Sequence, residues 1–249
     1  MPRSSSPYRS SIAFGPGPLS QTLKALIGAN VAVYLLQWVA GEMFGMNLAW
    51  TFGLIPYAVV QQLRVWQLVT YMFLHGGFMH LLFNMLALWM FGTDLERTWG
   101  TRYFLKFYFL TGIGAAILTI VFSLLPSTVS GDLYKIPIIG ASGAIYGLLL
   151  GYALYFPERP ILIFLFPVPA KYAVMIIGAI AFFSGDSNGI ANTTHLGGLL
   201  VGYLLLKGAR FHPLAEAKYW YLRWKMARTR RKFGVYEGGR TGDWKRRVH

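Results

Sequence analysis

The sequence contains no cysteine, and only 13% of its residues carry a charge. The lack of cysteine excludes disulfides, thiolate metal sites and a cysteine nucleophile. Soluble domains contain roughly a quarter charged residues, about twice the share found here. Because 55% of the residues are hydrophobic and the mean hydropathy is +0.46, the composition predicts a protein that crosses a membrane several times.

Acidic residues are especially scarce, with nine Asp or Glu against 23 Lys or Arg. Residues 207–249 hold thirteen of the basic residues and three of the acidic ones, a net charge of +10. Aromatic and basic residues alternate there in KYWYLRWKMARTRRKF, a mixture also found in nucleic-acid-binding segments. A cytoplasmic tail lying on anionic lipid explains the composition better, so we expect no nucleic-acid partner.

Six apolar stretches have the length and composition of membrane helices. They cover residues 22–40, 77–93, 103–125, 142–156, 167–184 and 190–207. Basic residues lie at both termini and in the connections after the second and fourth stretches, which places both ends in the cytoplasm. We therefore predict an all-α membrane protein whose six-helix core, 21–208, lies between a cytoplasmic N-terminal segment, 1–20, and a basic cytoplasmic tail, 209–249. The first segment has no apolar core and is not expected to be a secretory signal.

The fourth stretch is too short to cross a bilayer. From Ser142 to Phe156 a helix would measure about 22 Å, whereas the hydrocarbon core is about 30 Å thick. Pro137 and Gly140 argue against an earlier start. Because non-helical backbone at membrane depth must be covered by protein or line a water-filled cavity, we expect a sunken helix with Ser142 at its outer end, facing such a cavity.

Three further polar side chains are expected at the depth of Ser142. His80 and Asn84 are four residues apart and share one face of the second helix. His195 lies near the outer end of the sixth helix. The second, fourth and sixth helices all run from outside to inside, so the four groups fall in the outer leaflet, where polar side chains are usually functional.

These residue types suit acyl transfer. A serine hydroxyl becomes nucleophilic when a base takes its proton, and His195 is the best-placed base for Ser142. His80, Asn84 and the Ser142 backbone N–H are candidate donors to the oxyanion. No acid lies in a span beside His195, and Asp186 in the preceding loop is the only remote candidate, so we predict a Ser–His dyad. Tyr146, one turn after Ser142, is expected to support the imidazole.

Glycines predict a close contact between the fourth and sixth helices. Gly143, Gly147 and Gly151 recur every four residues, as do Gly198 and Gly202. Small residues at this spacing let two membrane helices approach closely, although the same pattern occurs in ordinary helix packing. Here the contact brings Ser142, which Gly140 and Gly143 flank, near His195.

A metal site is the competing interpretation, with His75, His80 and His195 as ligands. The sequence contains no HExxH motif, no acid lies nearby, and asparagine is a poor zinc ligand. We therefore predict neither a metal nor another cofactor.

Three segments, HGGFMHLLFN, GASGAIYG and HLGGLLVG, resemble in order and spacing the signature segments of the rhomboid intramembrane serine proteases. LERTWG resembles the segment with which that family closes its second helix. The resemblance implies Ser142 as nucleophile, His195 as base, Tyr146 packed against His195, and an oxyanion hole of His80, Asn84 and the Ser142 amide. It also implies a first loop half-embedded in the outer leaflet and a flexible cap around Phe183 to Asn192.

The expected substrates are single-span membrane proteins cleaved at or near the outer boundary, and the expected location is a bacterial cytoplasmic membrane. Two residues depart from the family pattern: Gln67 follows Trp66 where arginine is frequent, and Thr194 precedes His195 where alanine is usual. Inactive rhomboid relatives bind and escort membrane clients but typically lack the serine or the histidine, and both are present here. A transporter would show discontinuous helices and internal repeats, and no repeat is visible.

Overall fold

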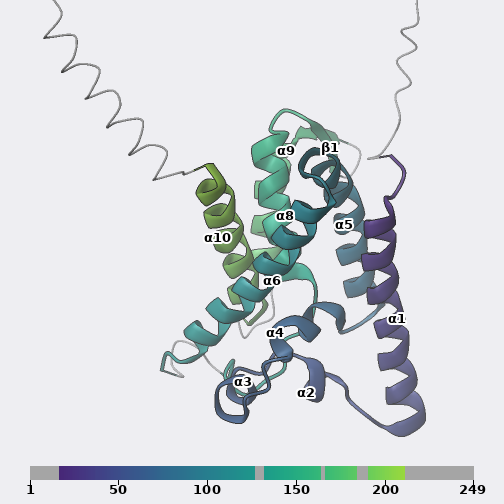
Figure 1. Ribbon diagram of the computed structural model, residues 1–249, viewed down its shortest axis with the longest axis vertical. Coiled ribbons are helices and arrows are strands. Elements are labelled where there is room, and N and C mark those ends of the chain that lie inside the picture. The colour runs from purple at the N-terminus through teal and green to yellow at the C-terminus, as the bar shows by residue number, and fades with distance from the viewer. Residues whose placement is uncertain (1–16, 127–131, 164–165, 184–189, 211–249) are drawn as a thin grey trace, which may run out of the picture. The chain divides into compact units, whose positions relative to one another are not determined.

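The computed structural model describes residues 17–126, 132–163, 166–183 and 190–210 (Figure 1). The chain divides into two compact units, Met1–Leu206 and Lys207–His249, and the account below concerns the first. The helices among the described residues are α1 (Gln21–Phe44), α2 (Ala49–Phe52), α3 (Pro56–Gln62), α4 (Gln67–Thr70), the 3-10 helix η1 (Tyr71–Phe73), α5 (Phe78–Trp99), α6 (Thr101–Ser123), α8 (Ser142–Tyr155), α9 (Ala170–Phe183) and α10 (Ile190–Arg210). Two short strands, β1 (Pro160–Ile163) and β2 (Phe166–Pro169), join α8 to α9. The predicted all-α class is confirmed.

Each of the six predicted apolar stretches coincides with a helix, namely α1, α5, α6, α8, α9 and α10. Three of these, α1, α5 and α6, are long and apolar enough to cross a membrane. Helix α8 and residues Ala170–Ile180 of α9 are apolar but shorter. The chain is therefore an integral, multi-pass membrane protein. The count of six spans and the predicted domain boundaries stay predictions.

A buried carboxylate joins three helices at one end of the bundle. Ser20 caps α1 by accepting a hydrogen bond from the Leu23 amide at 3.1 Å, and its hydroxyl donates to Glu96 on α5. The other oxygen of Glu96 accepts from Thr101, at the start of α6, at 2.7 Å. Because Glu96 is only 6% exposed, these partners replace the water that its carboxylate loses.

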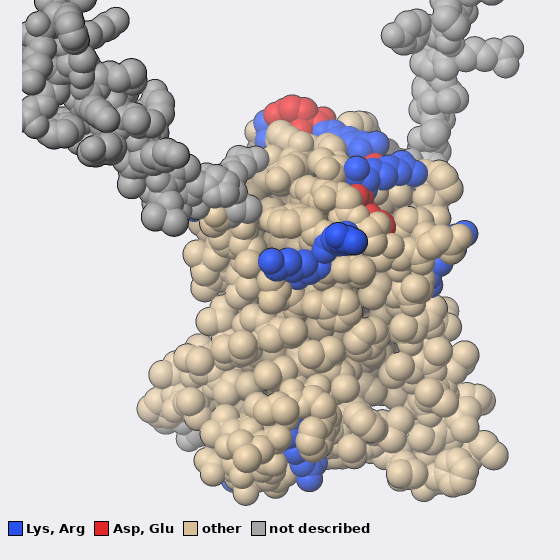
Figure 2. Space-filling view, in the orientation of Figure 1, with Lys and Arg blue, Asp and Glu red and all other residues tan. Residues whose placement is uncertain are grey.

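A second carboxylate explains why α5 continues beyond the predicted end at residue 93. Asp94 is buried and pairs with Arg159 at 2.8 Å, while the Tyr152 hydroxyl lies 3.4 Å from the same oxygen. These partners come from α8 and the turn that follows it, so the last turn of α5 is held by tertiary contacts. Figure 2 shows the charged side chains of the visible face gathered mainly at one end, above a broad band of other residues.

Helix α8 is the centre of the bundle and packs against α5, α6 and α9 (Figure 1). Its contact with α10 is made through backbone. A Cβ placed on Gly198 would lie 2.0 Å from the carbonyl oxygen of Gly143, and one on Gly202 would lie 3.0 Å from the Gly147 Cα. Only glycine permits this approach. The third glycine of the α8 repeat, Gly151, instead faces Trp99.

The long first loop is tied to the segment that leads into α8. Leu54 and Ile138 exchange two backbone hydrogen bonds of 2.9 Å each, and the Gly140 amide donates to the Tyr71 carbonyl at 2.9 Å. The loop consists of short helices and exposes many large apolar side chains, among them Met46, Trp50, Phe52, Val60, Leu63, Val65 and Trp66. Its embedding in the outer leaflet stays a prediction.

Gln67, which stands where arginine is frequent in the family, anchors this loop. The Gln67 side chain is completely buried. Its Oε1 accepts from the Ile55 amide at 3.0 Å, and its Nε2 donates to the Thr51 carbonyl at 3.2 Å. Trp66 donates to the same carbonyl at 3.1 Å. The uncharged Gln67 amide therefore satisfies the Ile55 N–H and the Thr51 carbonyl. A charged arginine buried at this position would first have to lose its hydration.

The β1–β2 hairpin differs from the sequence prediction. Its antiparallel register pairs Pro160 with Pro169 and Ile161 with Val168. The predicted fifth stretch began at residue 167, but α9 begins at Ala170. Pro167 and Pro169 each lack a backbone N–H, which suits the short paired strand better than a helix interior.

The contact between α8 and α10 predicts the effect of one methyl group. Gly198→Ala should lower the free energy of unfolding by about 3 kcal/mol, the upper part of the range for overpacked sites, because the added Cβ meets rigid backbone. Gly28→Ala is the matched control, since nothing lies within 4 Å of a Cβ there. Unfolding of both variants in the same detergent measures the difference. Equal stability of the two would contradict the close contact.

Candidate active site

Ser142 is the first residue of α8, where the sequence analysis placed it. The turn before it passes through Gly140, whose φ of +127° favours glycine. The first bond of the helix runs from the Ile145 amide to the Ala141 carbonyl at 3.1 Å. The amides of residues 142–144 thus precede the helical ladder and form the positive end of the helix dipole.

His195 reaches Ser142 from α10. Its Nε2 lies 2.9 Å from the Ser142 Oγ, a distance suited to a hydrogen bond that the hydroxyl donates. The Tyr146 ring stacks on the imidazole, with centroids 4.2 Å apart and planes 9° from parallel. The structure therefore brings the three predicted residues into direct contact.

The His80 imidazole lies beside the turn that precedes Ser142. A Cβ placed on Gly140 would be 2.8 Å from the His80 Nε2 and 3.7 Å from the Ser142 Oγ. The other ring nitrogen, Nδ1, accepts a hydrogen bond from the Gly76 amide at 3.3 Å. Nε2 is thus the nitrogen that faces the candidate site.

Asn84 lies one turn further along α5 and is 7% exposed. Its Nδ2 donates to the His80 carbonyl at 2.8 Å, within its own helix. The amide group has a second N–H, which this bond leaves available. The contact joins Asn84 to His80 rather than to a neighbouring helix.

The second ring nitrogen of His195, Nδ1, has no acidic partner among the described residues. The Nδ1 of His195 is buried there without a hydrogen-bond partner. Asp186, the remote candidate, and residues 184–189 of the expected cap lie outside the described residues. In the part of the chain that the structure describes, the imidazole is held by the stacked Tyr146 ring and by the Ser142 hydroxyl on Nε2.

His75, a ligand in the competing metal interpretation, lies beside His80. It is 2% exposed, and its ring meets the His80 ring edge to face at 5.0 Å. Across the described ranges, no three His, Cys, Asp or Glu side chains group closely enough to hold a metal ion. The prediction that the protein uses no metal remains a prediction.

Thr194 finds a partner that the sequence did not indicate. Its hydroxyl lies 3.0 Å from that of Thr119 on α6, and Thr119 donates its proton to the Ala115 carbonyl. Thr194 must therefore be the donor to Thr119. This buried pair links α10 to α6 directly behind His195.

Comparison with known proteins gives the family of the chain. Residues 62–209 match the family model described as the rhomboid domain, which covers α4 to α10 and all four polar groups. The chain belongs to the rhomboid family.

Three relatives show how far the similarity extends. The chain is 35% identical to the rhomboid protease GluP of Bacillus subtilis over 177 residues, which is 71% of this chain and 32% of the relative. It is 32% identical to the mitochondrial rhomboid protein 1 of Saccharomyces cerevisiae over 72% of this chain and 51% of the relative. Identity to the rhomboid protease GlpG of Yersinia pestis is 29% over 80% of this chain and 65% of the relative. The aligned part thus spans from about a third to just under two thirds of these relatives.

The turn at Gly140 predicts a sensitive position. Gly140→Ala should lower the free energy of unfolding by about 1–3 kcal/mol, the range for a side chain forced into a rare backbone conformation. It should also displace the His80 ring, which lies 2.8 Å from the added Cβ. Gly178→Ala, where nothing lies within 4 Å, is the control for unfolding measurements in detergent. Identical stability of the two variants would show that the turn tolerates a side chain.

Proposed function

We propose that this rhomboid family member is an intramembrane serine endopeptidase that cleaves single-span membrane proteins at or near the outer membrane boundary. The observation that carries the proposal is the 2.9 Å contact between the Ser142 Oγ and the His195 Nε2 at the outer end of α8. The names of the bacterial relatives, GluP and GlpG, as rhomboid proteases support it. A bilayer-spanning substrate and a bacterial cytoplasmic membrane, with both termini of the chain in the cytoplasm, are part of the same proposal.

The proposed reaction begins with attack of Ser142 on the scissile carbonyl. His195 takes the hydroxyl proton through Nε2 and returns it to the leaving amine, which yields an acyl-enzyme. Water then gives a proton to His195 and attacks the ester carbonyl. The bond between the acyl carbon and the Ser142 Oγ breaks, His195 returns the proton to Oγ, and the second product leaves as a carboxylic acid. Hydrogen bonds from the His80 Nε2, the Asn84 Nδ2 and the Ser142 amide stabilise the oxyanion in both steps.

The cationic tail after residue 208 fits a role outside this chemistry. Its residues 211–249 lie outside the described part of the chain, and all the proposed catalytic groups precede it. We assign the tail to contact with anionic lipid of the inner leaflet, where each basic residue near the surface contributes about 1 kcal/mol.

A membrane-client binding protein is the alternative within the same fold. The intact pair of Ser142 and His195 favours the protease, because a client-binding role requires neither the hydroxyl nor the base. Incubation of the detergent-solubilised protein with a model single-span substrate separates the two functions: the protease releases fragments, and the binding protein retains the substrate whole.

The first prediction from this proposed function concerns the dyad. Ser142→Ala and His195→Ala should each abolish cleavage, because loss of the nucleophile or base in a soluble serine protease costs about 10⁶ in kcat. Ser123→Ala on α6 is the matched control, since its hydroxyl donates to the Ile120 carbonyl of its own helix. Cleavage of the model substrate and thermal unfolding are measured for all three. Full activity of the folded Ser142→Ala protein would refute the assignment.

The second prediction concerns Asn84. If its free N–H stabilises the oxyanion, Asn84→Ala should reduce kcat by up to about 10²–10³, the loss on removal of one oxyanion donor. If Asn84 only packs, the variant should lose about 0.6 kcal/mol of stability, as for an average membrane hydrogen bond, and keep its kcat. Both quantities are measured on the same protein. A stability loss with unchanged kcat would remove Asn84 from the proposed site.

A further inference from the structure

Gln37 on α1 clamps the backbone immediately before α5. Its Oε1 accepts from the His75 amide at 2.9 Å, and its Nε2 lies 3.5 Å from the His75 carbonyl as donor. The Gln37 side chain thus pairs with both the N–H and the C=O of His75, the two backbone groups that a neighbouring β-strand would otherwise satisfy. Gln37 precedes the matched rhomboid domain, which begins at residue 62.

The clamped residue is next to the amide that holds His80. The Gly76 amide donates to the His80 Nδ1 at 3.3 Å, so Nδ1 must present its lone pair. In a neutral imidazole with one proton, that proton is then on Nε2. Nε2 is the nitrogen beside Gly140 and Ser142, so the tautomer set by Gly76 is the one that can donate to an oxyanion there.

The His75 ring strengthens the same link. It is 2% exposed and packs edge to face on the His80 ring at 5.0 Å. The ring is therefore positioned by its packing on His80 and by the backbone that Gln37 holds. Movement of the His75 backbone would therefore move both the Gly76 amide and the surface on which His80 rests.

We propose that Gln37 is a positioning residue for His80: by clamping the His75 backbone it fixes the Gly76 amide, which keeps the His80 proton on Nε2. The expected effect on catalysis rests on the proposed function. The effect of Gln37 on the His80 tautomer does not depend on that function and can be tested separately.

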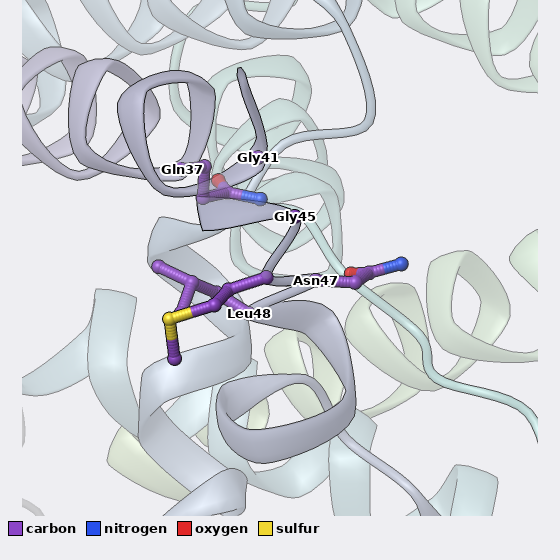
Figure 3. A pocket seen from close by; sticks show the side chains of 6 residues that line it. Gln37, Gly41, Gly45, Asn47 and Leu48 are labelled. Carbon is purple, nitrogen blue, oxygen red and sulfur yellow. The ribbon is translucent and has the colours of Figure 1, made fainter. Parts of the chain in front are cut away.

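The surroundings of Gln37 permit a clean test. The side chain lies at the wall of an open pocket lined also by Gly41, Gly45, Met46, Asn47 and Leu48 (Figure 3), so a replacement of similar length meets no packed wall there. Gln37→Met keeps the length and removes both hydrogen bonds. Gln37→Glu keeps the acceptor for the His75 amide. Leu36→Met, at a neighbouring position that is 63% exposed, is the control.

The first measurement is the His80 tautomer in detergent, from ¹⁵N shifts of the histidine rings, with His80→Gln to assign the signal. We expect the Nε2-protonated form in the wild type, Leu36→Met and Gln37→Glu, and a mixture of tautomers in Gln37→Met. An Nδ1-protonated His80 in the wild type, or an unchanged tautomer in Gln37→Met, would overturn the proposal. If Gln37→Met does not fold, Gln37→Leu, which also removes both hydrogen bonds, takes its place, and an unchanged tautomer in that variant would equally overturn the proposal.

The second measurement separates kcat from KM on the model substrate. We expect Gln37→Met to lose about tenfold in kcat, the lower end of the loss when a partner that orients a functional histidine is removed. KM should stay within about twofold of the wild type, and Gln37→Glu should keep most of the kcat. A loss in Gln37→Glu equal to that in Gln37→Met, or a change in KM alone, would contradict a positioning role. Absence of cleavage by the wild type would refute the proposed function, and the tautomer would still test the clamp.

Discussion

The arrangement of the candidate site depends on one contact, the approach of the α8 and α10 backbones at Gly143 and Gly198. No hydrophobic force drives helices together inside lipid, so close packing and hydrogen bonds must do so. A Cβ on Gly198 would be 2.0 Å from the Gly143 carbonyl, which leaves no room for any side chain between the helices. Ser142 directly precedes this contact and His195 lies one turn before it. Their 2.9 Å separation therefore follows from how the helices pack.

The irregular backbone around this contact is satisfied from within the protein. The segment before Ser142 pairs with Leu54 and with the Tyr71 carbonyl, and the first loop that supplies these groups is fastened by Gln67. Unsatisfied backbone groups at membrane depth cost several kcal/mol each, so such pairing is a condition for a helix that starts below the surface. The loop is thus part of the support of Ser142, although it contributes no proposed catalytic side chain.

Hydropathy and spacing predicted the six helices, the start of α8 and the meeting of Ser142, His195 and Tyr146, because these features follow from local composition and helix periodicity. The β1–β2 hairpin was not predicted, since its apolar residues continue the pattern of the fifth stretch and only strand pairing distinguishes them. The partners of Asp94 and Gln67 lie far away in the sequence or on the backbone, where no residue pattern reveals them. Gln37 was missed for the same reason: a lone glutamine in an apolar span was its only signal, and its partner is the main chain of His75.

The residue types at the candidate site agree with its surroundings. Serine, histidine, asparagine, tyrosine and glycine carry no permanent charge, whereas the buried carboxylates of the described chain, Asp94 and Glu96, lie toward the far end of α5. An ion held permanently at membrane depth is costly unless it is paired, but an oxyanion that exists only during reaction needs oriented dipoles and no fixed counter-charge. The Tyr146 ring stacks on His195, and among the described residues no carboxylate pairs with the His195 Nδ1. Among the described residues, the proposed serine chemistry would therefore rely on oriented dipoles and the stacked ring rather than on a third, charged group.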